Sequence, residues 1–453
     1  MKSLLKKTAL AATLFFMLCT AASAQMPYVV SLSMKDTQSV PGLQSFCHAL
    51  YGGKLLVFGG RTNGFHLTST RESTFPTVYA NEQFSVIDLA TRQVWSMPIP
   101  TAYMAMLRST NMQCYQDGST LYCCGGYGST CDADSASCYQ TFPNLTAINV
   151  PLIMNLVMSG KDPSSAIVSI TDERMRTGGG SLQKMGNYFY LVFGHNFHTI
   201  YKGGLTGIYT EQIRKFQINY DGTNLSIANY QTISTPLTYQ GLSQFHRRDL
   251  NVYPTVMTDK SIGIGIFGGV FTTQAGPFPN PISVEPSVSS TDLVRIDTTF
   301  QQRFCLYECP AVLVYDSLAN RMFTTLLGGI TDYYYDQNNQ ITPSNFSNFM
   351  PFFNHASTMV REASGSYSEY PQLSPALPGY LGANGIFIPA PGLPYYQGTE
   401  IINLNKLPGG PVLVGWMYGG IMATAPQASQ FNPTFASTKI YEIYIQKNVA
   451  AKH

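Results

Sequence analysis

The sequence predicts an all-β protein, a six-bladed β-propeller with four strands in each blade. Three observations support this fold class: strands that end in glycine recur along the chain, two repeats share one internal spacing, and the composition is typical of a β-rich protein with many tight turns. Of the 453 residues, 44% are hydrophobic and only 11% are charged, and there are 39 glycines and 29 tyrosines. The apolar content is sufficient for a large core, and the composition argues against a disordered chain or a coiled coil.

An apolar strand followed by one or two glycines occurs six times. Five copies end in a glycine pair, and the third is degenerate because His195 follows Gly194. The spacing between copies is roughly 70 residues, longer than the ~50 of a compact blade, and we attribute the excess to loop insertions. The six segments span residues 55–60, 121–126, 190–195, 264–269, 325–329 and 416–420.

The remaining strands of each unit also repeat. An alternating strand at 84–89 follows the first glycine pair, and the distance from Gly60 to Asp88 equals that from Gly269 to Asp297. This agreement favours a four-stranded unit. We therefore expect residues 25–453 to form one propeller domain, in which residues 28–34 complete the last blade beside a C-terminal strand at 440–445 and so remove a free sheet edge.

Residues 1–24 are typical of a secretory signal peptide. Three lysines precede an apolar run at 8–19, and small residues at 22–24 form a cleavage site. We expect the protein to be exported, secreted or periplasmic, with no transmembrane segment, because no other apolar run is long enough to span a bilayer. Without those lysines the formal net charge of +2 becomes −1. A nucleic acid partner is therefore not expected.

The cysteines are interpreted in the light of export. Eight remain after the leader, and an even number in an oxidising compartment favours disulfides. Cys131–Cys138 is the better short-loop candidate and Cys305–Cys309 the weaker one. Zinc-knuckle spacing is not found, and neither a metal nor a cofactor is predicted.

The first unit resembles a kelch repeat. Gly59-Gly60 is followed by the strand at 84–89 and then by Trp95, and the kelch family places a glycine doublet after its second strand and a tryptophan near its fourth. The resemblance extends over the chain from residue 25 as repeat spacing, although only two tryptophans occur, so most units lack the family tryptophan. It implies a six-bladed kelch-type propeller.

Candidate ligand-binding residues follow from this architecture. In a propeller, the loop after strand two and the loop entering strand one open on the same face. Counting back from the first hairpin turn places three arginines at nearly one repeat position, and converging guanidinium groups would bind a carboxylate, sulfate or phosphate. The alternative is that each arginine binds loop carbonyls or a nearby acid. The predicted ligand-binding residues are Arg61, His66, Arg108, Arg176, His195, His198 and Arg248.

Two functions remain open at this point. The first is a binding module for a glycan or a protein, and the arginines would suit an anionic one. The second is an enzyme that acts on an acidic sugar, similar to an epimerase or mutarotase, in which the arginines bind the carboxylate and a histidine or Glu308 transfers protons. Kelch-type copper radical oxidases use a Tyr-His pair, which this sequence lacks. The sequence leaves open whether the protein is an enzyme, which residues would be catalytic, which ligand it binds and its oligomeric state.

Overall fold

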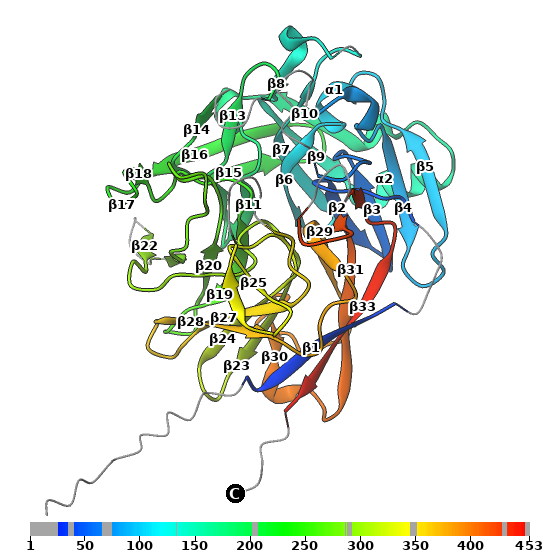
Figure 1. Cartoon of the computed structure of the whole chain (residues 1–453). Coiled ribbons are helices and arrows are strands. Elements are labelled where there is room, and N and C mark those ends of the chain that lie inside the picture. The colour runs from blue at the N-terminus through cyan, green and yellow to red at the C-terminus, as the bar shows by residue number, and fades with distance from the viewer. Residues whose placement is uncertain are drawn as a thin grey trace, which may run out of the picture.

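The computed structural model confirms the predicted fold class: six β-sheets are arranged around one axis as a six-bladed propeller (Figure 1). The structure describes residues 26–34, 40–65, 75–132, 134–201, 207–285, 287, 292–344, 351–427 and 433–448. The predicted signal peptide lies outside the described residues. Within the described ranges, no helix is both long and apolar enough to cross a membrane.

The first three blades are antiparallel and follow the chain order. Blade 1 contains β2 (Cys47–Tyr51), β3 (Lys54–Phe58), β4 (Gln83–Asp88) and β5 (Val94–Pro98). Blade 2 contains β6 (Thr110–Asp117), β7 (Thr120–Ser129), β9 (Asn144–Asn149) and β10 (Ile167–Thr171), with β8 (Tyr139–Thr141) added to β7. Blade 3 contains β11 (Ser181–Met185), β12 (Tyr188–Val192), β15 (Ile213–Tyr220) and β16 (Leu225–Ile233).

The other three blades complete the ring. Blade 4 contains β19 (Asn251–Val256), β20 (Ile262–Phe267), β21 (Ile282–Glu285) and β22 (Leu293–Ile296). Blade 5 contains β23 (Ala311–Asp316), β24 (Arg321–Leu327), β27 (Ala356–Arg361) and β28 (Tyr367–Gln372). Blade 6 contains β29 (Tyr380–Pro389), β31 (Pro411–Ala423), β33 (Ile440–Lys447) and β1 (Tyr28–Ser33), with β32 (Thr434–Ala436) added to β31.

Smaller elements occupy the connections between these strands. Three two-stranded ladders are β13 (His195–Phe197) with β14 (Gly207–Tyr209), β17 (Thr238–Tyr239) with β18 (Leu242–Ser243), and β25 (Tyr333–Tyr335) with β26 (Ile341–Pro343). The α-helices of the described residues are α1 (Met104–Leu107) and α2 (Val150–Met158). The 3-10 helices of the same residues are η1 (Thr77–Tyr79), η2 (Ala136–Cys138), η3 (Pro163–Ala166), η4 (Glu173–Met175) and η5 (Leu404–Lys406).

The glycine pairs join each blade to the next. The second residue of every pair donates its backbone N–H to a carbonyl at or just before the start of the first strand of the following blade, and the degenerate third copy does the same through Gly194. Both residues of each pair have positive φ, and Phe193 takes the first of these positions in blade 3. A Cβ atom on Gly125 would lie 1.9 Å from the carbonyl oxygen of Thr177, so only glycine fits this approach. The recurring motif is therefore the contact between blades.

The N-terminal strand closes the ring, as predicted. β1 pairs antiparallel with β33 over six residues, from Tyr28 opposite Lys447 to Ser33 opposite Glu442. The first and last strands of the described chain therefore lie side by side in blade 6 (Figure 1). The Gln372 side chain also bonds both backbone groups of Val30, at 2.9 and 2.8 Å, and so ties this strand to blade 5.

A long insertion in blade 6 covers one end of the central channel. β30 (Ile402–Asn403) lies in the connection between β29 and β31, and it pairs in parallel with the end of β23, the innermost strand of blade 5. In the same connection, the Tyr396 hydroxyl donates to the Lys260 carbonyl of blade 4 at 3.3 Å. This segment lies at the end of the channel where the first strands finish, and it accounts for the longest spacing between glycine pairs.

One of the two candidate disulfides is present. Cys131 and Cys138 are bonded, which confirms the better candidate, whereas Cys305 and Cys309 are free. The expected short-loop disulfide is therefore confirmed, and only the weaker candidate is wrong. The free thiols of the described residues are mostly buried among strands of the core, where they act as small apolar side chains. They are Cys47, Cys114, Cys123, Cys124, Cys305 and Cys309.

Candidate ligand pocket at the channel mouth

A closed ring of backbone hydrogen bonds surrounds the channel where the first strands of the blades begin. One residue of each blade donates its N–H to the carbonyl of the equivalent residue in the preceding blade, and the sixth bond joins blade 1 to blade 6. The six N···O distances lie between 2.6 and 3.3 Å. We call these residues the polar ring: Ser45, Asn111, Gly179, Asp249, Glu308 and Asn384.

A pocket lies at the ring and receives residues from all six blades. Its cavity volume is about 60 Å³, which is room for roughly four to six waters at about 10–15 Å³ each. Five of the six polar-ring residues line it, and Glu308 is represented by its neighbour Tyr307. The apolar and aromatic lining consists of Phe65, Phe75, Tyr127, Phe197, Tyr201, Tyr307, Ile330, Ala383 and Ile421. The pocket therefore combines aromatic walls with a polar floor, as small-molecule sites commonly do.

Arg248 is the charged donor of the pocket. Its side chain is 3% exposed, and its guanidinium lies 5.0 to 5.6 Å from the ring centroids of Phe197, Tyr201, Tyr209 and Phe271. It donates to the Tyr201 and Tyr209 hydroxyls at 2.8 and 3.0 Å. Asp249 is its carboxylate partner, at 3.4 Å from Nε. The positive charge is thus held in an aromatic enclosure and is already neutralised by an adjacent acid.

His195 accepts a hydrogen bond from Arg248 and so fixes the position of the guanidinium group. Arg248 Nη1 lies 2.8 Å from His195 Nδ1, so Nδ1 accepts and the imidazole proton is on Nε2. Burial, with the charge of Arg248, lowers the pKa of His195 to about 3. The ring stacks on Tyr209 at 4.3 Å, and the residue is fully buried. His195 is therefore a neutral positioning residue for Arg248.

Two acids of the polar ring have raised pKa values. Burial raises the pKa of Asp249, against the opposing effects of Arg248 and Asn111, whose amide donates to the Asp249 carboxylate at 3.0 Å. Burial, together with the charge of Asp249, raises the pKa of Glu308 to about 8. Two neighbouring carboxyl groups in a poorly hydrated channel disfavour double ionisation. At neutral pH the ring therefore retains a proton on Glu308.

Asn384 and Ser45 complete the polar floor on the opposite side. The Asn384 amide donates to the Ser45 hydroxyl at 2.7 Å. The side-chain amide oxygen of Asn384 is buried and has no hydrogen-bond partner within the described part of the chain. A buried acceptor without a donor costs about 1–3 kcal/mol, so the pocket offers a ligand hydroxyl a place where it would be favourably bound.

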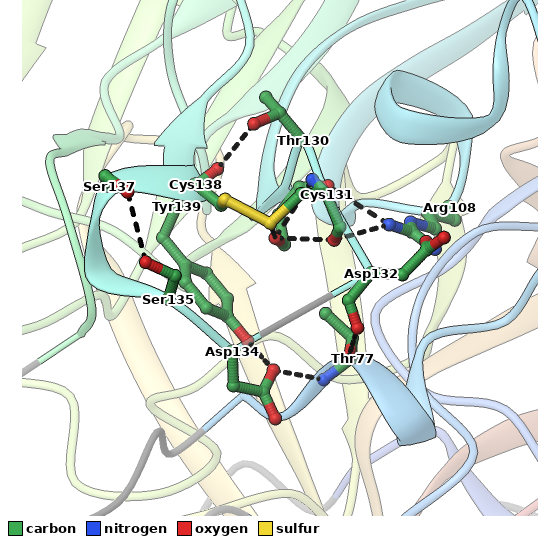
Figure 2. Close-up of a disulfide and its surroundings, with 11 residues drawn as sticks. Thr77, Arg108, Thr130, Cys131, Asp132, Asp134, Ser135, Ser137, Cys138 and Tyr139 are labelled. Carbon is green, nitrogen blue, oxygen red and sulfur yellow. Dashed lines mark hydrogen bonds and ion pairs between the residues drawn. A yellow bond between two sulfur atoms is a disulfide. The ribbon is translucent and has the colours of Figure 1, made fainter.

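The three arginines singled out by the sequence do not meet at this pocket. Arg108 binds Glu82 at 2.5 Å and Asp132 at 3.1 Å, and it also donates to carbonyls of the loop closed by the Cys131–Cys138 disulfide (Figure 2). Arg176 binds Glu173 at 2.7 Å. Among the three, only Arg248 lines the central pocket. Each arginine is paired with a carboxylate, which corrects the expected convergence of three free cations on one anion.

The other predicted ligand-binding residues are dispersed. Arg61 lies under the Phe75 ring at 5.1 Å and lines a small neighbouring cavity together with Arg108. Burial lowers the pKa of Arg61 to about 10. His198 is exposed, and His66 lies outside the described residues. The tyrosine run Tyr333–Tyr335 forms β25 and packs against other aromatic side chains away from the pocket.

The polar ring itself was missed by the sequence reasoning. Counting back from the hairpin turns misplaced Arg248, because the first strands differ in length between blades. The interblade hydrogen bonds place Arg108 and Arg176 three residues before the ring and Arg248 one residue before it. The signal that would have found the ring is a set of small or polar residues after the carbonyl that each glycine motif contacts. The offset is two positions in five blades and three positions in blade 6, from Leu381 to Asn384.

Comparisons with known proteins add little beyond the fold. No protein-family model matches the chain, and no curated protein matches it in sequence. A solved structure titled "Structure of YjhT" aligns with 88% of this chain and 99% of its own at 10% identity, with a TM-score of 0.46. The propeller assignment rests on the strand pairing, and the kelch resemblance stays a prediction. Within the described residues, no group of three or more His, Cys, Asp or Glu side chains is arranged to hold a metal ion.

Proposed function

We propose that the protein is a binding module whose channel-mouth pocket holds one neutral sugar residue of a glycan. The observation that carries the proposal is the combination of aromatic walls with a polar floor. The floor contains the Ser45 hydroxyl, the Asn111 and Asn384 amides and the Asp249 carboxylate. Sugar rings stack their apolar faces on aromatic side chains, while their hydroxyl groups exchange hydrogen bonds with such polar groups. The free volume suits a single pyranose ring, not a longer chain.

The charge of the pocket favours a neutral ligand over an anionic one. Arg248 is the only guanidinium in the pocket lining given by the structure, and Asp249 lies beside it. A ligand carboxylate would have to compete with Asp249 for Arg248, close to the second acid Glu308. A hydroxyl group faces no such competition and meets the side-chain amide oxygen of Asn384, which has no partner among the described residues. This ordering of ligands is the reverse of the anion preference that the sequence suggested.

Glycan-array screening followed by calorimetry tests the proposal. Neutral glycans are expected to bind, and acidic ones that differ only by a carboxyl group are expected to bind more weakly. The Asn384→Ala variant should lose about 10- to 100-fold in affinity, the value of one buried hydrogen bond. Asn338→Ala, in the exposed turn of the β25–β26 ladder, is the matched control. Equal affinity of wild type and Asn384→Ala, or selective binding of acidic glycans, would contradict the proposal.

A second candidate function is an enzyme that transfers protons on a sugar in the same pocket. The specific observation that favours it is the Asp249–Glu308 neighbourhood, in which one acid is protonated and the other is ion-paired at neutral pH. A protonated acid beside an ion-paired carboxylate is suited to general acid and base roles. An assay of anomer interconversion by NMR distinguishes the two functions, because Glu308→Gln should abolish turnover by an enzyme but leave binding by a module nearly intact.

Export is proposed as the setting of this activity. It is supported by the basic, apolar and small-residue segments at 1–24, and by the bonded Cys131–Cys138 pair, because disulfides persist in oxidising compartments. Fractionation of the producing cells, with N-terminal sequencing of the product, tests it: an intact Met1 on cytoplasmic protein would contradict export.

A further inference from the structure

A second and larger groove lies between blades 4 and 5. It has a volume of about 620 Å³, ten times that of the central pocket. Its lining includes β21 and β22 of blade 4 on one side and the β27–β28 hairpin of blade 5 on the other. None of its residues lines the central pocket. The groove is therefore a separate feature that the proposed function does not use.

Two buried donors in this groove lack partners. Arg361 ends β27 and Tyr367 begins β28, and they are direct partners across this antiparallel pair, so their side chains project from the same face of the sheet. Arg361 Nη2 and the Tyr367 hydroxyl are both buried, and neither has a hydrogen-bond partner among the described residues. Both residues line the groove.

Among the described residues, Arg361 also has no carboxylate in direct contact, although Glu285 and Asp259 act on its charge from a greater distance. Its side chain is 3% exposed, and its other N–H groups donate to the backbone carbonyls of Val256 at 2.6 Å and Glu362 at 3.0 Å. In the part of the chain that the structure describes, no carboxylate lies within ion-pair distance of it. Burial lowers the pKa of Arg361, as expected for a cation without a contacting anion. Leaving a buried guanidinium without a counter-charge is costly, so a ligand carboxylate that reached Arg361 would be bound favourably.

The opposite wall of the groove limits the charge of such a ligand. Glu285 binds Arg295 at 2.8 Å, and Asp297 accepts hydrogen bonds from Thr299 and Phe300. These two acids are satisfied, but their charge disfavours phosphate, sulfate or a dicarboxylate. Met257, Ile296 and the Tyr367 ring supply apolar surface.

We propose that this groove binds a small monocarboxylate with an apolar body, and that its carboxylate is held by Arg361 and Tyr367. One carboxylate oxygen accepts from Arg361 Nη2 and the other from the Tyr367 hydroxyl, a charge-assisted pair of bonds. The apolar body lies against Met257 and Ile296. The site shares no residue with the central pocket. A test of this proposal is therefore independent of the proposed glycan binding.

Benzoate and its uncharged analogue benzamide provide a matched pair of probes. Titration of the full-length protein by ligand-observed NMR is expected to show saturable benzoate binding and at least tenfold weaker benzamide binding. Phosphate and succinate are expected to bind more weakly than benzoate. Equal binding of benzoate and benzamide, no saturable binding of benzoate, or preferential binding of phosphate would overturn the proposal.

The Tyr367→Phe variant tests the hydrogen bond from the Tyr367 hydroxyl to the carboxylate without threatening the fold. It removes only a hydroxyl group that has no partner, so the thermal stability of the ligand-free protein should stay equal or rise slightly, whereas the benzoate affinity should fall about tenfold. Arg361→Met should abolish binding, and it is interpreted only if its circular dichroism matches the wild type. Tyr370→Phe, on the same strand but outside the groove lining, is the control and should bind benzoate like the wild type. An unchanged affinity in Tyr367→Phe would exclude the assigned bond.

Discussion

The chemistry of the central pocket depends on one buried ion pair. Arg248 and Asp249 are consecutive residues, and the pair is enclosed by Tyr201, Tyr209 and His195. Asp249 holds a positive φ of 52° in the polar ring, a conformation that Asp and Asn tolerate better than most residues. The backbone of the ring therefore sets the position of the acid, and the acid sets the charge available to a ligand.

Removing the Arg248 cation alone should lower the free energy of unfolding more than removing the charges of both Arg248 and Asp249. Arg248→Met leaves Asp249 buried without its partner, and it is expected to lower the free energy of unfolding by about 3–5 kcal/mol. The double variant Arg248→Met/Asp249→Asn should recover most of that loss, because asparagine suits the positive φ. Urea denaturation of the two single variants and the double variant measures the coupling. A double variant that is as unstable as the sum of the single variants would show that the pair is not coupled.

The raised pKa of Glu308 predicts a specific dependence of stability on pH. The folded protein holds a proton on Glu308 up to about pH 8, whereas the ordinary pKa of a glutamate side chain is 4.5. The folded state therefore binds more protons than the unfolded state between these values, and stability falls as pH rises from about 4.5 to about 8. Allowing for partial exposure, the loss is on the order of 2 kcal/mol.

Glu308→Gln should flatten this part of the stability profile, as measured by urea denaturation from pH 5 to 9. Glu173→Gln is the control. The Glu173 carboxyl is bonded by Arg176, which lowers its pKa, so its contribution is lost only as pH falls below the ordinary range. An unchanged slope in Glu308→Gln would mean that Glu308 is hydrated and titrates normally.

At the scale of elements, the sequence predicted what the backbone repeats and missed what the loops add. The glycine pairs, the four-stranded units and the closing strand were all readable, because each is required by backbone geometry in every blade. The insertion that carries β30 was not, since a spacing of unusual length shows that residues are added but not where they lie. The arginine register was wrong for the related reason that hairpin turns are not at a fixed distance from the channel mouth.

In the closing strand β1, a charged substitution is expected to destabilise the fold on one face only. Val30 is 1% exposed and packs in the core of blades 5 and 6, whereas the neighbouring Ser31 is half-buried on the other face. Val30→Asp should cost about 3 kcal/mol or more, because it buries an unpaired carboxylate. Ser31→Asp, the matched control, should cost less than about 1 kcal/mol. Thermal unfolding followed by circular dichroism compares them, and equal losses would show that β1 is not tightly packed.

The Cys131–Cys138 loop is a second element whose contribution can be measured. Opening it in the double variant Cys131→Ser/Cys138→Ser should lower the free energy of unfolding by about 2–3 kcal/mol in the chain-entropy account. Arg108 binds the Cys131 carbonyl and Asp132 within this loop, so part of the loop should stay in place (Figure 2). Comparing urea denaturation of the double variant with that of the wild type reduced by dithiothreitol checks this, since both should lose the same amount.

At the scale of the whole molecule, two circular sets of hydrogen bonds join the blades. One is formed by the glycine pairs and the other by the polar ring, and each contains six bonds that close on themselves. Every blade is thus held by both of its neighbours at the channel end. A closed ring has no terminal unit that can unfold with a contact to one neighbour only, unlike a linear repeat array.

This closure predicts that the six blades unfold together. Val30→Asp disturbs the packing between blades 5 and 6, but it should lower the protection of amides in the distant β12 of blade 3 by nearly the same free energy as in β33. The reason is that opening the ring at one junction removes the constraint on every blade, so the most protected amides of all blades exchange through one global opening. Hydrogen exchange read by mass spectrometry, under conditions where the wild type and the variant are both folded, measures the loss blade by blade. Protection that falls in blade 6 and blade 1 while β12 keeps its wild-type value would show that the blades open independently, and that the two hydrogen-bonded rings position the pocket without coupling the fold.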